Sequence, residues 1–270
     1  QGAFHEIAAR FYFSEQPVEI VPAHTFDELI KLVEEGEHAD VALMAIENTI
    51  AGSLMYNYDL LNQSQLQLTG ETFSRIKQNL LVQPATEIAD LTEVHSHPIA
   101  LAQCRKFFQK YPHIKLVSKV DTALSARELM ENKTPHIGAV ASTLAAEMYE
   151  LDVLADSIET NKMNYTRFLV LERKLDSEIG EEINKISLHF TVKHEPGSLY
   201  KILAVLSAYN VNLTKIQSAP IIGKQWEYRF FVDFMAENRR FAEQAINAIR
   251  PLTPELKVMG MYRQGEHFEY

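Results

Sequence analysis

The feature that most constrains the fold is the alternation of helix and strand patterns through the first 170 residues or so. Residues 40–46 form a short apolar run suited to a strand buried on both faces. Helical patterns lie on either side of this run, and the earlier helix opens with a capping box at Thr25 and Glu28. Further strands are expected at residues 94–96, 114–118, 136–141 and 166–171. This order predicts an open α/β sheet that binds ligands at the carboxyl ends of its strands.

A second pattern begins after Leu171. The next residues are charged and poorly periodic, as in a linker. From Lys185 onward, about 80 residues show a strand–helix–strand–strand–helix–strand order, which is the split-βαβ, ferredoxin-like arrangement. The sequence therefore predicts two domains, residues 1–171 and 186–270, joined by a linker over 172–185.

Charge and composition exclude several classes of function. The chain has 36 acidic residues against 26 lysines and arginines, a net charge of −10, so it lacks the basic surface that binds nucleic acid. Its single cysteine, Cys104, excludes an intramolecular disulfide and fits a reducing compartment. No apolar run approaches the roughly 18 residues of a membrane span, and no secretory signal pattern is visible. We expect a cytoplasmic protein that binds neither nucleic acid nor membranes.

Polar residues follow the predicted strand that ends at Ile46. Glu47, Asn48 and Thr49 come next and Gly52 follows, at a strand end that would face a crevice. Glu47 could act as a general acid or hold a substrate hydroxyl, and Asn48 offers both a donor and an acceptor. The same residues could instead cap the next helix.

Two predicted helix starts add groups that suit an anion. Ser96 precedes a helix that begins at Pro98, and Gln103 lies two turns after Ser96 on the same side. Ser142 and Thr143 open another helix. Exposed N–H groups at such starts favour an anion, although both serines could simply be helix caps.

The last polar stretch lies where a loop enters the strand at 166–171. Thr166 could donate a hydrogen bond to a departing hydroxyl. Arg167 is so close to a buried strand that it must be paired. Its partner is either a ligand carboxylate, held through two hydrogen bonds, or a carboxylate of the protein core.

Other chemistries lack a signature. His95 and His97 have no third ligand at a sensible spacing, so no metal site is predicted. The sequence contains no glycine-rich phosphate loop, no HExxH and no G-x-S-x-G motif. The residues alone indicate a pocket between two lobes for a small, acidic, hydroxylated ligand.

Taken together, these stretches resemble the prephenate dehydratase family. The resemblance covers nearly the whole chain and rests on four motifs in the family's order. They are Glu-Asn-Thr at 47–49 with Gly52, Ser-His-Pro at 96–98 with Gln103-Cys104, Ser-Thr-x-Ala-Ala at 142–146, and Asn-x-Thr-Arg-Phe at 164–168. The trailing domain resembles the ACT regulatory module, which binds phenylalanine in this family.

The resemblance implies a fold and a reaction. The catalytic domain would be a two-lobed α/β fold of the periplasmic-binding-protein-like type II class, with its site in the cleft between the lobes. One lobe would take residues 1 to about 75 and 160–171, and the other about 76–159. The reaction would be decarboxylating dehydration of prephenate to phenylpyruvate, water and CO2 in L-phenylalanine biosynthesis, with no metal or organic cofactor.

The resemblance also implies roles for individual residues. Thr166 would assist departure of the hydroxyl, with Glu47 as the other possible proton donor, while Asn48 and Gln103 would orient the substrate. The remaining substrate-binding positions would be Ser96, Arg167, Phe168, Ser142, Thr143, Ala3 and Phe4. The effector-binding positions would be Gly197, Ser198, Leu199, Gln217 and Ser218.

Two stretches depart from the family pattern. The N-terminal Gly2-Ala3-Phe4-His5 replaces a Gly-Thr-aromatic-Ser motif, so two hydroxyls of that wall become Ala3 and His5. In the second domain, Gln217-Ser218-Ala219-Pro220 replaces Glu-Ser-Arg-Pro and so lacks a charge pair of the usual effector region.

Two other functions remain open at this point. Arogenate dehydratase differs only in the substrate side chain, which carries an amino group in place of the keto group. A non-catalytic amino-acid sensor would combine the same two folds without turnover. For either enzyme, the resemblance implies a homodimer or homotetramer paired through the ACT domains.

Overall fold

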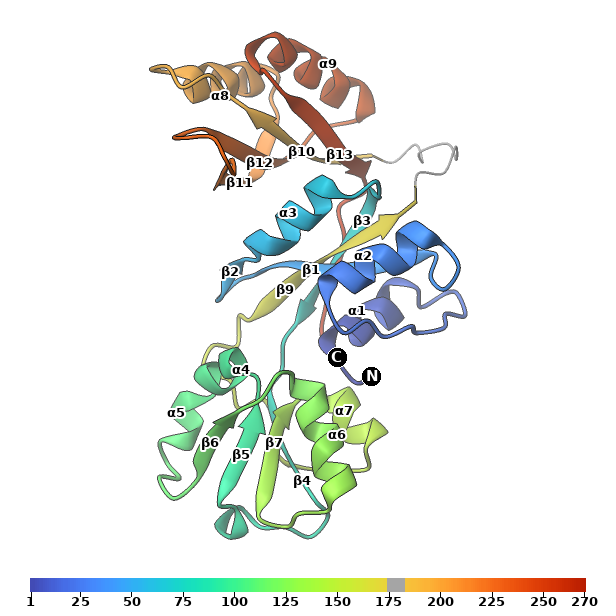
Figure 1. Cartoon of the computed structure of the whole chain (residues 1–270), viewed down its shortest axis with the longest axis vertical. Helices are drawn as coiled ribbons and strands as arrows, with labels where there is room; N and C mark the ends of the chain where they lie inside the picture. Colours follow the sequence, from blue (N-terminus) through green and yellow to red (C-terminus); the bar gives the residue numbers. More distant parts are fainter. Residues whose placement is uncertain (174–182) are drawn as a thin grey trace.

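The computed structural model describes residues 1–173 and 183–270, so most of the predicted linker lies outside the described residues. The described chain forms three sheets, each with its own helices (Figure 1). In Figure 1 a ferredoxin-like domain lies at one end, the lobe that contains α1 to α3 lies in the middle, and a second lobe lies at the other end. Among the described helices, none is long and apolar enough to cross a membrane.

The middle lobe, called lobe A, is built on a five-stranded sheet in the order β14-β3-β9-β1-β2. Its strands are β1 (Val41–Asn48), β2 (Gly52–Ser53), β3 (Gln67–Arg75), β9 (Tyr165–Glu172) and β14 (His267–Phe268). Its helices are α1 (Phe4–Tyr12), α2 (Phe26–Glu35) and α3 (Met55–Gln63). Thr25 caps α2 as predicted, because its side chain accepts from the Glu28 N–H at 3.1 Å. The Glu28 carboxylate bonds to the N–H of His24 rather than to that of Thr25.

The second lobe, called lobe B, has the strand order β6-β5-β7-β4-β8. Its strands are β4 (Asn79–Val82), β5 (Glu93–Ser96), β6 (Lys115–Ser118), β7 (Ile137–Ala141) and β8 (Asp152–Ala155). Its helices are η1 (Ile88–Asp90), α4 (Pro98–Gln103), α5 (Arg105–Phe108), α6 (Thr122–Asn132) and α7 (Thr143–Met148). Strand β5 runs parallel to β6 and β7, so the helices after β5 and β7 start at the same edge of the sheet.

The chain joins the two lobes through two crossing segments. It leaves lobe A after β3 and returns from lobe B before β9, so the described residues 1–173 form two lobes. The lobes also touch where α7 of lobe B meets α1 of lobe A, since Leu144 packs in one buried cluster with Ile7 and Phe168. Polar residues near the crossings are therefore held between two separately folded sheets.

The ferredoxin-like domain has the antiparallel strand order β11-β12-β10-β13. Its elements are β10 (Lys185–Thr191), α8 (Ser198–Ala208), β11 (Asn212–Pro220), β12 (Tyr228–Met235), α9 (Arg239–Ile249), η2 (Arg250–Leu252) and β13 (Leu256–Tyr262). The predicted βαββαβ order is confirmed. Both long helices cover one face of the sheet and leave the other face for lobe A (Figure 1).

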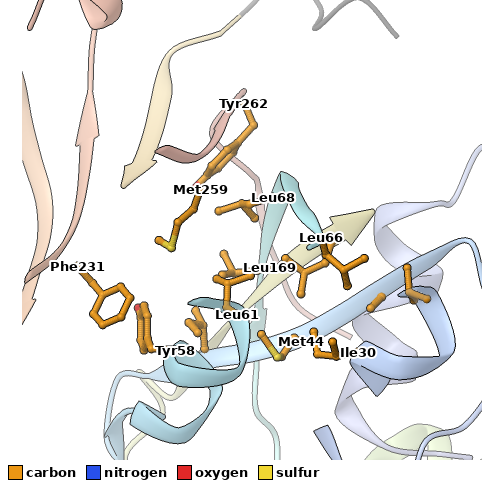
Figure 2. Packing of buried hydrophobic residues seen from close by; sticks show 14 of the residues in the cluster. Ile30, Met44, Tyr58, Leu61, Leu66, Leu68, Leu169, Phe231, Met259 and Tyr262 are labelled. Carbon is orange, nitrogen blue, oxygen red and sulfur yellow. The ribbon is translucent and has the colours of Figure 1, made fainter. Parts of the chain in front are cut away.

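One hydrophobic core continues from lobe A into the ferredoxin-like domain (Figure 2). The rings of Tyr58 on α3 and Phe231 on β12 lie 4.8 Å apart. Met259 and Tyr262 of β13 belong to the same buried cluster as Leu68. At Gly260 a side chain would collide with the Leu68 carbonyl, since a Cβ there would lie 2.0 Å from its oxygen. The two domains therefore share a packed interface.

Candidate active site

A cluster of amide and hydroxyl side chains lies near the crossing segments. The Asn48 Nδ2 atom donates to Thr166 Oγ1 at 3.0 Å and to Asn164 Oδ1 at 2.8 Å. The side-chain oxygen of Asn48 accepts from the N–H groups of Ile50 and Ala51, which fixes the direction of the amide. Because the Thr166 oxygen accepts this hydrogen bond, its own proton remains available for a ligand.

Gln103 joins the cluster from lobe B. Its Oε1 atom accepts from Asn164 Nδ2 at 3.0 Å and from Gln78 Nε2 at 3.4 Å. The structure thus brings Asn48, Thr166 and Gln103 into one connected group, as their assignment to a single site requires.

Ser96 lies elsewhere. Its side chain is fully buried, and its hydroxyl donates to the Val140 carbonyl at 2.6 Å. The cap of α4 is His97, whose Nδ1 accepts from the Ile99 N–H, and the helix that begins at Pro98 ends at Gln103, with Cys104 between it and α5. The structure therefore differs from the prediction that Ser96 and Gln103 point to the same side, since the Ser96 hydroxyl bonds within the core of lobe B and Gln103 bonds to Asn164.

The starts of α1 and α7 meet at a small interlobe cavity of about 10 Å³, just enough room for one water. The residues that line it are Phe4, Ile7, Arg75, Lys77, Ser142, Thr143 and Tyr270. Ala3 stands at the N-cap of α1 without a side-chain hydrogen bond. This interlobe cavity collects three predicted binding residues, Phe4, Ser142 and Thr143, from opposite lobes.

Ser142 and Thr143 both make hydrogen bonds beside this cavity. Ser142 is a helix cap, because its Oγ atom accepts from the Ala145 N–H at 3.0 Å and donates to the Gly2 carbonyl at 2.6 Å. Thr143 Oγ1 accepts from Asn79 Nδ2 at 3.1 Å and is half-buried. Ser142 therefore holds the N-terminal residues against lobe B, while Thr143 remains open to the cavity.

Two basic residues that line the interlobe cavity, Arg75 and Lys77, were not predicted as site residues from the sequence. Arg75 lies at the end of β3 and donates to Glu269 Oε2 at 2.8 Å, and Lys77 follows two residues later. Among the residues that the structure describes, Lys77 makes no hydrogen bond or ion pair. No strand was predicted over residues 67–75, so the sequence pattern offered no reason to place these two basic residues in the site.

Arg167 is buried between lobe A and the ferredoxin-like domain. Its Nε atom donates to Glu71 at 2.6 Å, one terminal nitrogen bonds to Asp233, and the other donates to Tyr262 Oη at 3.0 Å. Lys185 of β10 also reaches Glu71, at 2.6 Å. The sequence left open whether Arg167 binds a ligand carboxylate or a carboxylate of the protein core. The structure shows protein carboxylates, those of Glu71 and Asp233. Because Arg167 is 3% exposed and each of its three nitrogens already bonds to a protein group, the predicted contact with a substrate carboxylate differs from what the structure shows.

Glu47 lies on the same side of the sheet as Arg167. A register shift between Ala45 and Glu47 pairs Glu47 with Arg167 and Asn48 with Thr166. Glu47 accepts from Arg167 at 3.3 Å and bonds to Lys215 of β11. Because neighbouring strand residues point to opposite faces, Glu47 turns away from the Thr166 cluster. The two predicted candidates for the proton donor, Thr166 and Glu47, therefore lie on opposite faces of the sheet.

Phe168 packs in the core beneath Thr166, on the face that α1 covers. It is 1% exposed, and its ring meets the His5 ring edge-on at 4.9 Å. Burial lowers the pKa of His5 to about 4, so this imidazole is neutral at physiological pH. Phe168 and His5 therefore place two uncharged rings in contact with each other on the face of the sheet that carries Thr166.

Comparison with known proteins identifies the family. The prephenate dehydratase family model matches residues 1–176, and the ACT domain model matches residues 186–243. The chain belongs to the prephenate dehydratase family. The ferredoxin-like domain is its ACT domain.

Relatives in this family carry two activities in their names. The chain is 35% identical over 268 residues to the bifunctional chorismate mutase/prephenate dehydratase of Escherichia coli, covering 97% of this chain and 68% of that protein. It is 36% identical over 279 residues to arogenate dehydratase 2 of Petunia hybrida, covering 97% of this chain and 69% of that protein. The solved prephenate dehydratase of Arthrobacter aurescens in complex with L-Phe is 27% identical, with a TM-score of 0.85 and coverage of 97% and 87%.

The ACT domain carries a larger pocket of about 290 Å³. Gly197, Ser198 and Leu199 line it at the start of α8, with Trp226 and Phe230 among its aromatic residues. The other two predicted effector residues lie outside this pocket. Gln217 accepts from Ser53 of lobe A at 3.3 Å, and Ser218 is exposed on β11. The replacement of Glu-Ser-Arg-Pro in this chain therefore affects the contact with lobe A.

No metal-ligating cluster is present in the described ranges, 1–173 and 183–270, where no three His, Cys, Asp or Glu side chains are suitably grouped.

Proposed function

We propose that this prephenate dehydratase family member catalyses the decarboxylating dehydration of prephenate to phenylpyruvate, water and CO2, as a step of L-phenylalanine biosynthesis. The observation that carries the proposal is the hydroxyl of Thr166, held by Asn48 in a cluster that also includes Gln103. The match of the family model over residues 1–176 supports the same reaction.

The reaction breaks two bonds, and the electron pair released by the first bond moves through the ring to expel the leaving group of the second. The bond between the ring and its carboxylate breaks, and its electron pair enters the ring. The carbon–oxygen bond on the opposite side of the ring then breaks, and the leaving hydroxide takes up a proton to become water. Aromatisation supplies the driving force, so the enzyme needs to position the substrate and stabilise the leaving oxygen.

Thr166 suits the second of these tasks. A threonine hydroxyl is too weak an acid to give up its proton outright, but it can donate a hydrogen bond to the oxygen as negative charge develops there. Asn48 directs its own N–H at the Thr166 oxygen, which leaves the Thr166 proton free for the substrate. Gln103 and Asn48 orient the substrate, and Phe4, Ser142 and Thr143 bound its other side.

The experiment is a steady-state assay that follows phenylpyruvate absorbance. We expect Thr166→Ala to lower kcat for prephenate by about 10²–10³-fold, the usual range for losing one such group. Thr166→Ser retains the hydroxyl and should keep most of the activity. Thr134→Ala, which removes a partly exposed threonine of lobe B, is the matched control. A folded Thr166→Ala enzyme with wild-type turnover would overturn the role of Thr166.

Arogenate is the second candidate substrate, because relatives in the family are named arogenate dehydratase. Arogenate carries an ammonium group where prephenate has a keto group, and the cavity that holds Arg75 and Lys77 disfavours another positive charge. The same assay with arogenate, read as phenylalanine formed, should give the lower kcat/KM. A chain that turns over neither substrate but binds phenylalanine would be an amino-acid sensor.

L-Phenylalanine is the proposed effector of the ACT domain. The pocket of about 290 Å³ at Gly197, Ser198 and Leu199 has the size and aromatic lining for one aromatic side chain. Gln217 and Ser218 would act through their position on β11 at the contact with lobe A. Calorimetric titration with L-phenylalanine, together with the assay, tests this. Absence of both heat and inhibition would contradict it.

Several finer features belong to the same proposal. The two lobes joined by crossing segments support a catalytic domain of the periplasmic-binding-protein-like type II class over residues 1–171, followed by a linker at 172–185 and the ACT domain from residue 186. The expected end of the ACT domain at residue 270 differs from the structure, because β14 (His267–Phe268) pairs with β3 in the sheet of lobe A. We also propose a homodimer or homotetramer and a cytoplasmic location. Sedimentation of the purified chain and fractionation of cells that express it would test these two points.

A further inference from the structure

The segment that follows β13 leads from the ACT domain back to lobe A. Residues His267–Phe268 form β14, which pairs in parallel with β3 so that His267 stands opposite Phe73. A side chain at Gly265 would collide with lobe A, since a Cβ there would lie 1.9 Å from the Glu71 carbonyl oxygen. The Phe268 ring stacks on Phe11 of α1 at 3.9 Å. Backbone pairing and side-chain packing thus fix this segment against lobe A.

The two residues after β14 lie at the interlobe cavity. Glu269 Oε2 accepts from Arg75 at 2.8 Å, and the Tyr165 hydroxyl lies 3.4 Å from the other carboxylate oxygen. Tyr270 lines the interlobe cavity itself, and its hydroxyl donates to Glu147 on α7 of lobe B at 3.0 Å. A protein carboxylate therefore stands beside the cations of the cavity.

Arg75 has hydrogen-bonding capacity that Glu269 does not use. Its Nε atom is buried and has no hydrogen-bond partner in the described part of the chain. The second carboxylate near it, that of Glu159, is 3.7 Å away and is already bonded to the Gln78 N–H and the Ser157 hydroxyl. A guanidinium prefers to bind a carboxylate through two parallel hydrogen bonds. Arg75 is thus a cation with only one short carboxylate contact.

We propose that Arg75, with Lys77 beside it, binds a carboxylate of the substrate, and that Glu269 occupies Arg75 when the cavity holds no substrate. The inference rests on the proposed function, in which the substrate carries two carboxylates. Glu269 is half-exposed, and an ion pair of this kind is weak, so an incoming carboxylate can replace it. The cavity has room for only about one water, so Tyr270 moves with Glu269 when the substrate enters.

Kinetics of four variants test the inference. We expect Arg75→Met to raise KM for prephenate by roughly tenfold to a hundredfold, because a charge-assisted contact is lost. Glu269→Gln should lower KM by about two- to fivefold, the size of an exposed ion pair. In the double variant Arg75→Met/Glu269→Gln, the second substitution should no longer lower KM, because Arg75 is absent and Glu269 has no cation to release.

The ACT domain offers a closely matched control. Glu255 pairs with Arg229, and the exposed fractions of that pair, 50% and 18%, match the 49% and 17% of Glu269 and Arg75. Glu255→Gln should therefore leave KM for prephenate unchanged. An equal fall in KM in both glutamine variants would overturn the inference, since it would reflect net charge alone.

A binding measurement separates this inference from the proposed function. Prephenate is titrated calorimetrically into Thr166→Ala and into Thr166→Ala/Arg75→Met, so that binding is read without turnover. If wild-type chain gives no phenylpyruvate but prephenate binding weakens at least about tenfold without Arg75, the reaction fails and the inference stands. If turnover is normal and neither KM nor binding responds to Arg75→Met, the inference fails and the reaction stands. Should Arg75→Met not fold, Arg75→Lys and Glu269→Gln carry the same test.

Discussion

Arg167 and Arg75 lie on adjacent strands of lobe A, yet their surroundings are opposite. Arg167 faces the ACT domain, is 3% exposed, and uses its nitrogens on Glu71, Asp233 and Tyr262. Arg75 faces the interlobe cavity, and its Nε atom has no partner among the described residues. The difference separates two tasks. A buried arginine whose three nitrogens are all hydrogen-bonded to the protein joins domains, as Arg167 does, whereas one with an unbonded nitrogen at a cavity, such as Arg75, can bind a ligand. Arg167, the arginine of the Asn-x-Thr-Arg-Phe motif, therefore joins the two domains.

The largest expected effect is on the stability of the domain contact. Arg167→Met leaves Glu71 and Asp233 buried with fewer partners, so we expect the free energy of unfolding to fall by about 3–5 kcal/mol. Arg75→Met breaks a half-exposed pair and should lower it by about 1 kcal/mol or less. Urea denaturation of both variants measures the difference. Equal losses in the free energy of unfolding would show that Arg167 and Arg75 stabilise the fold to the same extent, and would contradict this prediction.

Acid pH should weaken the domain contact before it breaks the Arg75 pair. Burial, and next the nearby Arg229, lowers the pKa of His189 to about 4, against 6.5 for an unperturbed histidine. Between these values the unfolded chain binds more protons than the folded one. Stability is therefore full above about pH 6.5 and falls as the pH drops toward 4, by at most about 3 kcal/mol for one imidazole.

His189 shares a sheet face with Lys185 and meets the ring of Phe231 at 5.6 Å, so this loss belongs to the domain contact. Urea midpoints at pH 7 and pH 4.5 measure it. His189→Phe should lose less stability on acidification than the wild type, while the exposed His24→Gln should lose the same. The hydrogen bond from Arg75 holds the pKa of the Glu269 carboxyl below its ordinary value. An unchanged acid response in His189→Phe would contradict this assignment.

The smallest expected effect is at the rim of the domain contact. Lys215 pairs with Glu47, donates to Ser53 at 2.9 Å and lies over the Tyr58 ring at 5.3 Å. Because Glu47 is partly exposed, Lys215→Met should lower the free energy of unfolding by about 1 kcal/mol. Lys224→Met, in an exposed pair on the same domain, should change it by less than about 0.5 kcal/mol. A loss in Lys215→Met as large as in Arg167→Met would show that Glu47 stabilises the domain contact as strongly as Glu71 does.

Much of the fold follows from local patterns in the sequence. The run at 40–46 became the core of β1, and the βαββαβ order of the ACT domain is confirmed. Helix caps were readable where a polar residue preceded an apolar stripe, as at Thr25. Periodicity and capping report short-range geometry, and short-range geometry was enough for these elements.

The polar cluster was predictable for the same reason. Asn48 and Thr166 each stand at the polar end of an apolar strand, and Gln103 lies on a helix that starts at a strand end. Strand ends and helix starts of an α/β fold gather at common edges, so their side chains could be expected to meet. The sequence by itself therefore determined which elements form and which motif residues approach one another.

Only the tertiary structure decided which face each charged residue occupies. A register shift at Ala45–Glu47 and the docking of the ACT domain place Glu47 and Arg167 at the domain contact. The return of the chain at β14 brings Glu269 to Arg75, a partner 194 positions earlier in the chain. A sequence pattern indicates that a strand face is buried but carries no information on what buries it, because that partner comes from a distant part of the chain.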